Sequence, residues 1–324
     1  MCKKLFTVES DRFDPYYNLA LEEYLLFSTQ PGSVILYLWQ NAHTVVIGCN
    51  QNCWAECRVS VLEAEGGHLA RRLSGGGAVY HDLGNLNFTF LCREEDYDLQ
   101  KQLSVIQRAC ALTGISATFS GRNDLLADGR KFSGNAFYHS HGMAYHHGTL
   151  LVDVDTQKMS RYLSPPKAKL EAKGVSSVRS RVVNLKELAP DLTCERMKQY
   201  MQTAFCQVYG QESQRLYLDE SDQEAVMRLR SRYAGEAWLY GKIFPFTCEM
   251  EGHFPWGHLQ LQLQVEQGIV RGVQVYTDAM DASLSGQLSD ALTGCAFRQE
   301  SLQQAVAGLP LGPALSEFFA THQL

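Results

Sequence analysis

The sequence predicts an α+β protein in which a large mixed β-sheet is flanked by helices and a small second α+β domain follows. Short β-prone runs and helical runs succeed one another without the regular strand–helix–strand repeat of a doubly wound sheet. Leucine and valine alternate with glutamine and glutamate from Leu259 to Val265, which is typical of a sheet with one solvated face. We therefore expect a large domain over residues 1–244 and a small one over residues 245–324.

The first helix is expected to begin at Asp14-Pro15, because Asp favours the N-cap and Pro the first helical position. Its inner face is predicted at Leu21, Tyr24, Leu25 and Ser28. Alternating or β-prone runs predict strands at 5–8, 34–39, 44–47, 68–73, 78–81, 85–91, 115–119, 131–138 and 145–152. Helical periodicity predicts helices at 54–65, 99–113, 195–209 and 222–233. In the small domain, a hairpin over 259–275 follows a linker at 240–247 and precedes helices at 285–292 and 300–307.

Composition places the chain among soluble globular proteins. Of its 324 residues, 45% are hydrophobic and 20% are charged, which is enough apolar material for a substantial core. The net charge of −6 argues against a general nucleic-acid binder. Since no apolar run approaches the roughly 18 residues of a membrane helix and the N-terminus lacks a signal-peptide core, we expect a cytoplasmic protein. No exposed apolar stripe is evident, so we expect a monomer.

A glycine-rich stretch suggests an anion-binding loop. Residues 71–81 read Arg-Arg-Leu-Ser-Gly-Gly-Gly-Ala-Val-Tyr-His. Glycines let the backbone approach a ligand closely, successive N–H groups can form an anion-binding nest, and arginine offers paired donors to carboxylate or phosphate. By itself the stretch is equally compatible with a solvated turn between two strands.

Further candidate groups for an anion follow along the chain. Asn123 and Asp124 lie in a polar turn, and Lys131 begins an apolar strand, where its ammonium could enter a pocket or stay in water. Asp124 could hold Mg²⁺ against a triphosphate or only cap a turn. Residues 158–181 hold seven Lys or Arg and one Glu, a local charge of 7 − 1 = +6. This basic stretch is either a solvated surface or a loop that closes on phosphates.

Other chemistries lack their motifs. The P-loop, the dinucleotide-binding glycine spacing, the Gly-x-Ser-x-Gly elbow and His-Glu-x-x-His are all missing. Four histidines are close in sequence, but no carboxylate or Cys accompanies them at a familiar spacing, so we expect no structural metal. These histidines are His139, His141, His146 and His147.

Five motifs, taken in order, resemble those of lipoate–protein ligases of the LplA type. They are Arg-Arg-x-Ser-Gly-Gly-Gly-Ala-Val-Tyr-His-Asp from 71, Gly-Arg-Asn-Asp-Leu from 121, Asp-Gly-Arg-Lys-Phe-Ser-Gly-Asn-Ala from 128, His-His-Gly-Thr-Leu-Leu from 146, and Lys-Gly-Val-x-Ser-Val-Arg-Ser-Arg-Val-x-Asn-Leu from 173. The resemblance covers nearly the whole chain, and the combination is far more specific than any one motif.

The resemblance implies a catalytic domain of the fold shared by biotin and lipoate ligases and a small C-terminal domain. It further implies activation of lipoate with ATP and Mg²⁺ to lipoyl-AMP. The lipoyl group would then pass to a lysine of a lipoyl domain, in a 2-oxoacid dehydrogenase or the glycine-cleavage H protein. Joining two anions needs positive charge and N–H donors at the reacting centre.

The resemblance also assigns residues. Lys131 would be catalytic and would contact both the lipoate carboxyl and the α-phosphate, and Asp124 would be on the Mg²⁺ side. Besides Lys131, the ATP and adenylate side would include Arg72, Gly77, Ala78, Val79, Tyr80, Asn123, Asp124, Lys173, Gly174 and Val175. The lipoate side would include Arg71, Ser74, Gly75, Gly76, His81, Lys131, His147 and Gly148. Residues 173–185 would form a loop that closes over the adenylate.

Three alternatives remain open. One is an octanoyl transferase of the same fold, some of which use a Cys nucleophile after the lysine motif, whereas here no Cys occurs between Lys131 and Cys194. Biotin ligation is disfavoured because the loop at 71–77 is of the lipoate kind. The last is a non-catalytic protein that binds lipoyl-AMP or a lipoyl domain.

Overall fold

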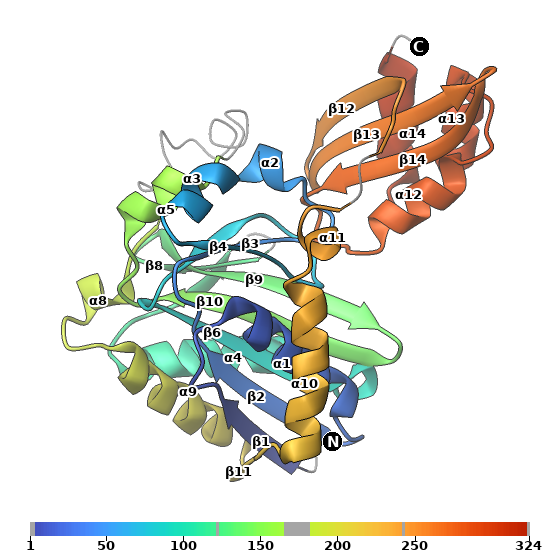
Figure 1. The fold of residues 1–324 in the computed structure, drawn as a ribbon. Coiled ribbons are helices and arrows are strands. Elements are labelled where there is room, and N and C mark those ends of the chain that lie inside the picture. Colours follow the sequence, from blue (N-terminus) through green and yellow to red (C-terminus); the bar gives the residue numbers. More distant parts are fainter. Residues whose placement is uncertain (1–3, 121–122, 165–181, 242–243, 323–324) are drawn as a thin grey trace. The chain divides into compact units, whose positions relative to one another are not determined.

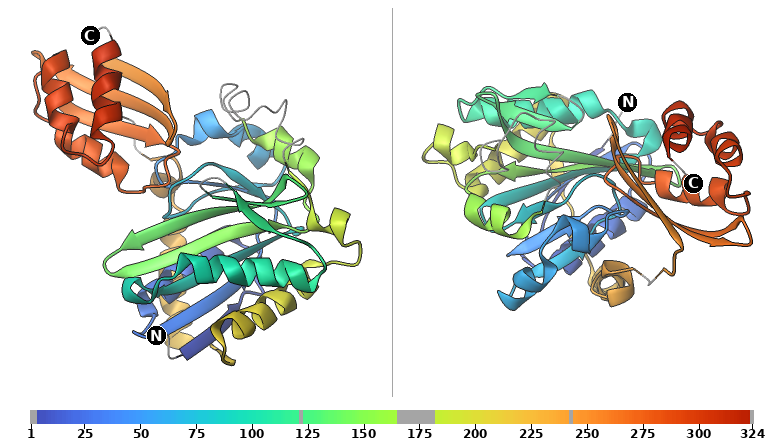
Figure 2. Two further views of the ribbon diagram at one scale, coloured as in Figure 1. Left: turned by 180° about the vertical axis from the view of Figure 1, so that it is seen from behind. Right: turned by 90° about the horizontal axis from the view of Figure 1, so that it is seen from above.

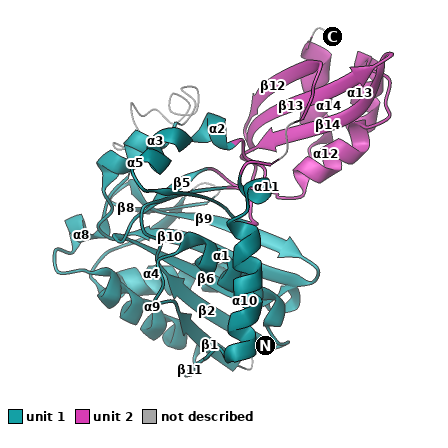
Figure 3. Ribbon diagram, viewed as in Figure 1, with its two compact units in different colours: residues 1–47, 53–72, 78–239 teal, residues 48–52, 73–77, 240–324 magenta. Residues whose placement is uncertain are grey.

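The computed structural model describes residues 4–120, 123–164, 182–241 and 244–322. They form two compact units (Figure 3). The first, which we call the catalytic unit, comprises residues 1–47, 53–72 and 78–239, and the second comprises 240–324 together with 48–52 and 73–77. The glycine-rich loop at 73–77 thus groups with the second unit, although it was placed within the large domain from the sequence. The boundary between residues 244 and 245 stays a prediction.

A mixed sheet of eight strands forms the centre of the catalytic unit, which confirms the predicted fold class. The strand β1 pairs in parallel with β11 and β2, whereas the remaining pairs are antiparallel. In spatial order the strands are β11 (Ser213–Arg215), β1 (Lys4–Glu9), β2 (Ser33–Trp39), β6 (Asn85–Arg93), β10 (Met143–Leu151), β9 (Arg130–Ser140), β8 (Asp124–Ala127) and β7 (Thr118–Ser120).

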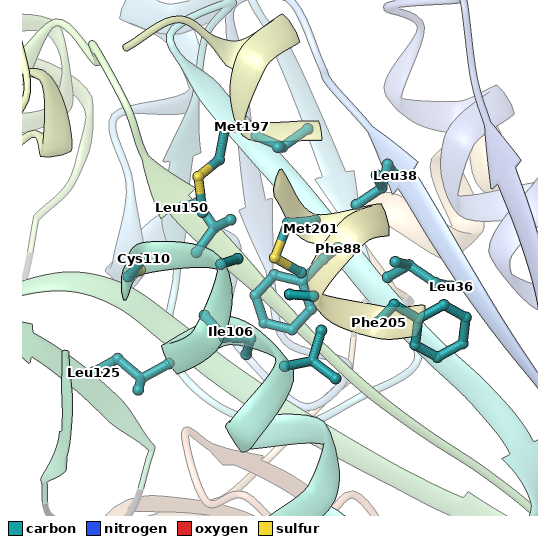
Figure 4. Packing of buried hydrophobic residues seen from close by; sticks show 14 of the residues in the cluster. Leu36, Leu38, Phe88, Ile106, Cys110, Leu125, Leu150, Met197, Met201 and Phe205 are labelled. Carbon is teal, nitrogen blue, oxygen red and sulfur yellow. The ribbon is translucent and has the colours of Figure 1, made fainter. Parts of the chain in front are cut away.

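Helices cover both faces of this sheet, as the views from front and back show (Figures 1 and 2). On one face lie α1 (Pro15–Ser28) and α10 (Glu220–Tyr233), and on the other α4 (Leu99–Leu112) and α9 (Cys194–Tyr209). All seven residues of β2 are buried, as expected for a strand covered on both sides. The core beneath α4 and α9 includes Phe88, Ile106 and Phe205 (Figure 4).

Local sequence explains how α1 begins, but its inner face was predicted incompletely. The Asp14 carboxylate accepts hydrogen bonds from the backbone N–H groups of Tyr16 and Tyr17, as an N-cap does. Leu21 and Leu25 are buried as expected, whereas Ser28 is exposed. The helix also buries Glu22 and Glu23, because α10 covers it from outside the sheet.

A smaller sheet and several short elements complete the catalytic unit. The sheet has the order β4 (His68–Arg71), β3 (Thr44–Ile47) and β5 (Val79–His81). The single helix expected over 54–65 is wrong: the chain forms two short helices, because the Arg58 N–H bonds the Tyr162 carbonyl between them. The short elements are α2 (Cys53–Glu56), α3 (Val59–Ala64), η1 (Glu94–Asp96), α5 (Thr156–Tyr162), α8 (Leu185–Leu188) and α11 (Glu236–Leu239).

The second unit is an antiparallel sheet with helices packed on its apolar face. The predicted hairpin, β13 (Gly257–Glu266) and β14 (Ile269–Thr277), gains an outer strand, β12 (Cys248–Phe254), that the sequence analysis missed. Leu259, Leu261 and Leu263 point into a core shared with α12 (Leu284–Leu292), α13 (Gln299–Val306) and α14 (Gly312–Thr321). Across the described residues of both units, no helix is both long and apolar enough to span a membrane.

Candidate functional site

Lys131 and Asp124 form an ion pair on two neighbouring strands near one edge of the large sheet. The Lys131 Nζ lies 2.7 Å from the Asp124 Oδ1, and the two side chains are 21% and 18% exposed. Asp124 begins β8 instead of lying in a polar turn, and β9 beside it carries Lys131 (Figure 1). Because this ion pair is only partly exposed to solvent, the Lys131 ammonium remains accessible to a ligand.

A β-bulge brings Lys131 to this position. The pairs Asp124–Gly134 and Leu125–Ser133 are followed by Leu126–Lys131, so one extra residue, Phe132, is inserted in β9. In a regular strand positions 131 and 134 lie on opposite faces, whereas the bulge places them together. A Cβ on Gly134 would lie 2.9 Å from the Lys131 Nζ. Glycine at 134 therefore leaves the space that the ammonium occupies.

The backbone of Lys131 also holds the chain that leaves the basic stretch. Val182 bridges Lys131 in parallel, and the Val183 N–H donates to the Lys131 carbonyl at 2.9 Å. The residues expected to contact the adenylate from this stretch, Lys173, Gly174 and Val175, lie outside the described residues. The described part of the predicted loop is thus attached at the candidate catalytic lysine.

Asn123 belongs to a second set of polar groups that crosses from β8 to β10. Asn123 and Asn135 exchange hydrogen bonds, and the Asn135 Oδ1 lies 2.8 Å from the His146 Nε2. The other ring nitrogen of His146 lies 3.2 Å from the Gln102 Oε1. Burial, reinforced by the charge of His147, lowers the pKa of His146 from 6.5 to about 3. His146 is therefore a neutral, structural histidine.

A buried polar cluster lies on the α1 side of the sheet. The Glu22 carboxylate is 2.8 Å from the His147 Nδ1 and accepts a hydrogen bond from the Thr89 hydroxyl at 2.7 Å. The Trp39 indole N–H donates to the same hydroxyl at 3.1 Å, and the Tyr145 ring lies over His147. We call Glu22, Trp39, Thr89 and His147, together with His81, the buried polar cluster.

His81 adds a second buried imidazole to this cluster. Its Nδ1 lies 3.2 Å from the Asn41 Nδ2, a donor, so the ring proton belongs on Nε2. That Nε2 is buried and has no hydrogen-bond partner among the described residues. Burial, followed by the charges of Arg72 and His147, lowers the pKa of His81 to about 3. A neutral imidazole thus presents an unsatisfied N–H beside the indole of Trp39.

The side chains of Arg71 and Arg72, both expected at the site, contact different parts of the chain. Arg71 donates from its Nε and Nη2 to the carbonyls of Trp238 and Leu239 at the end of α11, and its own carbonyl accepts from the Trp238 indole. Arg72 instead donates to the Val46 carbonyl, and its charge is one of two that help burial to lower the pKa of His81. This arrangement favours Arg72 over Arg71 as the neighbour of the buried polar cluster.

The glycine-rich loop is held by bonds within the second unit. The Gly76 N–H donates to the Ala279 carbonyl at 2.9 Å, and the Ser74 carbonyl accepts from Cys49. A Cβ on Gly75 would lie 2.3 Å from the Ala279 carbonyl oxygen, and Gly76 has a φ of +89°. Packing therefore requires glycine at 75 and the positive φ favours it at 76, and one N–H expected to face an anion is already bonded.

The remaining predicted residues have largely structural surroundings. Gly77 belongs to the second unit, and Ala78 leads into β5. Val79 pairs with Val46, and the Tyr80 ring packs against His43 and Tyr162. Gly148 allows β10 to approach β9, because a Cβ there would lie 2.7 Å from the Gly134 carbonyl oxygen.

Sequence reasoning missed Glu22, Trp39, Asn41 and Thr89. Their only signal was a pair of consecutive glutamates, Glu22 and Glu23, in a helix that is otherwise largely apolar. Burying a carboxylate is costly without partners, so such a pair in a covered helix indicates a polar cluster. The strand residues carried no comparable signal.

Comparison with known proteins identifies the family. The family model described as the lipoyl protein ligase A/B catalytic domain matches residues 14–206, and the model of the bacterial lipoate protein ligase C-terminus matches residues 244–319. A protein of Psychrobacter cryohalolentis named lipoate-protein ligase A is 40% identical over 308 residues, covering 93% of this chain and 91% of that protein. The chain belongs to the lipoate–protein ligase A family.

Solved structures of ligases agree with this assignment. The crystal structure of LipL1 of P. falciparum with lipoate superimposes with a TM-score of 0.84 at 26% identity, covering 98% of each chain. A lipoate-protein ligase A bound with ATP gives a TM-score of 0.66 at 25% identity and covers 75% of this chain and 100% of its own. A bipartite ligase of Thermoplasma acidophilum, described with its E2 lipoyl domain, gives 0.66 at 26% identity over 76% of this chain and 100% of its own.

Proposed function

We propose that this ligase activates lipoate with ATP to lipoyl-AMP and transfers the lipoyl group to a lysine of a lipoyl domain. The observation that carries the proposal is the half-buried pair of Lys131 and Asp124 on a bulge shaped around the ammonium. Relatives described with lipoate, with ATP and with a lipoyl domain support the three substrates.

In the first half-reaction, a lipoate carboxylate oxygen attacks the α-phosphorus of ATP and the bond to the bridging oxygen of pyrophosphate breaks. Negative charge from both reactants gathers at one point. The Lys131 ammonium would neutralise it, first at the carboxylate and then at the α-phosphate. A cation already positioned at a partly buried site stabilises such charge better than one in bulk water.

In the second half-reaction, the neutral amine of the acceptor lysine attacks the acyl carbon and the bond to AMP breaks. The amine loses its proton, and AMP leaves with the bonding electrons. Lys131 would remain beside the departing phosphate and stabilise its charge. The same side chain therefore serves both steps without moving far.

Asp124 fits a role in Mg²⁺ binding. Mg²⁺ in nucleotide sites is commonly held by one or two carboxylates together with phosphate oxygens, and Asp124 offers one carboxylate next to Lys131. Held there, Mg²⁺ would supply positive charge to the pyrophosphate leaving group. With ATP present, we expect the Lys131 ammonium to exchange its contact with Asp124 for the α-phosphate.

The buried polar cluster would hold the lipoyl side. The unsatisfied N–H of His81 would donate to the ligand, and Glu22 would hold the His147 ring in one orientation. Arg72, whose charge helps to lower the pKa of His81, would lie on this side, whereas the family resemblance places it on the nucleotide side. Arg71 would instead secure the end of α11.

The expected acceptors are lipoyl domains of 2-oxoacid dehydrogenases and the glycine-cleavage H protein. A ligase of this kind would meet them as a cytoplasmic monomer. Transfer from an octanoyl carrier is less well supported, because Cys194, the first Cys after Lys131, is a poor nucleophile. Burial raises the pKa of its thiol to about 12, and its Sγ–H donates to the Leu83 carbonyl.

The test is lipoate-dependent exchange of pyrophosphate into ATP, followed by transfer to an apo lipoyl domain. We expect exchange with lipoate and Mg²⁺, and a mass increase of one lipoyl group on the acceptor. No exchange would refute adenylation. Acyl transfer from an octanoyl carrier without ATP would support the transferase instead, and binding without exchange or transfer would support a non-catalytic protein.

A further inference from the structure

The open face of the second unit's sheet brings together three residues that can bind a metal. Glu251 and His253 lie on β12, and His258 lies on β13. One potential ligand atom of each lies within 4.8 Å of the other two. Within the described part of the chain, this is the group of His, Cys, Asp and Glu side chains that meets this condition.

The hairpin fixes these side chains on one face. His253 pairs directly with His258 across a tight turn closed by Phe254 and Gly257, and the two rings are 4.7 Å apart. Glu251 precedes His253 by two residues and therefore points to the same face. The opposite face carries Met250 and faces the apolar core of the unit.

His258 has a rigid backbone. Its N–H donates to the Asp278 Oδ1 at 2.7 Å, and its carbonyl accepts from the Thr277 hydroxyl at 2.6 Å. Its side chain is 20% exposed, whereas that of Glu251 is 56% exposed. One ligand is thus fixed, while Glu251 and the exposed His253 can turn toward an ion without disturbing the core.

We propose that Glu251, His253 and His258 bind Zn²⁺ or a similar divalent transition metal through one carboxylate oxygen and two imidazole nitrogens. The Glu251 Oε1 and the His258 Nε2 are already hydrogen-bonded at 2.7 Å, so an ion bound by both would replace the proton between them. Tetrahedral Zn²⁺ requires donors about 3.3 Å apart, within reach of small side-chain rotations. Water would complete the coordination.

The three ligand atoms determine which class of metal ion the site would prefer. Two imidazoles and one carboxylate suit Zn²⁺, Co²⁺ and Ni²⁺, whereas Mg²⁺ and Ca²⁺ prefer oxygen ligands throughout. The ion would link β12 to β13 and stabilise the strand that the sequence pattern does not predict. The site lies wholly within the second unit and is independent of the proposed ligase chemistry.

The experiment is a titration of the full-length chain with Co²⁺, followed by displacement with Zn²⁺. We expect one equivalent to give the visible bands of nitrogen and oxygen ligation without the intense near-ultraviolet absorption of cobalt–thiolate bonds. That distinction matters because the chain contains ten cysteines. No binding, or a thiolate spectrum, would overturn the proposal.

Variants locate the site. His253→Asn, His258→Asn and Glu251→Gln should each weaken binding by at least about tenfold, the loss typical of removing even an outer partner of a metal ligand. The matched control is His139→Asn, because His139 also lies beside a glutamate, Glu94, at 3.4 Å and is not part of the proposed site. Equal affinity in all four variants would contradict the site, and circular dichroism would verify that each is folded.

Discussion

Two polar regions of the catalytic unit differ in how far they are shielded from water. Lys131 and Asp124 are 21% and 18% exposed, whereas Glu22 and His147 are 2% and 8% exposed. In the first region a bulge and a glycine make room for a charge. In the second, the polar groups of Glu22, Trp39, Thr89 and His147 bond one another, whereas the Nε2 of His81 has no partner among the described residues.

This difference in solvent exposure indicates different roles for the two regions, one in the reaction and one in positioning the substrate. A partly exposed ion pair can exchange partners when a ligand arrives, because water and ligand both reach it. A fully buried network cannot exchange without leaving an unsatisfied group, which costs about 1–3 kcal/mol. We therefore propose that Lys131 catalyses adenylation and that the buried polar cluster holds the lipoyl group.

The largest expected effect comes from Lys131→Ala. Loss of the ammonium should lower lipoate-dependent pyrophosphate exchange about 100- to 1,000-fold, the usual result of removing one group that stabilises developing charge. The melting temperature should change little, because the pair is partly solvated. The control is Lys186→Ala, since Lys186 forms a comparable contact with Asp153 at 2.5 Å on the surface. Equal activity in both variants would remove Lys131 from the mechanism.

The buried His146 predicts a pH dependence of stability. Its pKa is about 3 in the folded chain against an ordinary 6.5, so between these values the unfolded chain binds the extra proton. Acidification from pH 7 to pH 5 should lower the free energy of unfolding by about 2 kcal/mol through this residue. Urea unfolding should show a shallower pH dependence in His146→Gln than in the wild type.

The control for this pH effect is the exposed His141, whose replacement by Asn should leave the wild-type slope. Parallel pH dependences for His146→Gln and the wild type would mean that His146 titrates normally in the folded chain.

A smaller effect is expected when Arg71 is replaced. Arg71→Ala leaves the carbonyls of Trp238 and Leu239 without their donor and should lower the free energy of unfolding by about 1–2 kcal/mol. The KM for lipoate should stay within about twofold of the wild type, since less than 0.5 kcal/mol of binding is at stake. Arg196→Ala, which removes an exposed bond to a carbonyl, should alter neither quantity. A tenfold rise in KM for Arg71→Ala would place that residue with the lipoate instead.

The sequence predicted the mixed sheet, the first helix and Lys131 at the start of its strand, because these depend on periodicity and local motifs. The bulge at Phe132 depends on pairing with β8 and has no local signal. Arg71 meets its partner 167 residues away, and the Gly75–Gly76 turn packs on Ala279, so neither contact could be predicted from spacing. The strand β12 was missed because only Met250 among its seven residues is buried.

The most direct test compares kcat and KM for lipoate in the exchange reaction of Lys131→Ala and His81→Ala. If Lys131 catalyses adenylation and His81 helps to hold lipoate, the two substitutions should have opposite effects on kcat and KM. Lys131→Ala should mainly lower kcat, whereas His81→Ala should raise KM about tenfold, the equivalent of one lost hydrogen bond of about 1.4 kcal/mol, with kcat largely kept. The same pattern in both variants, or the reverse, would contradict the division between the two regions.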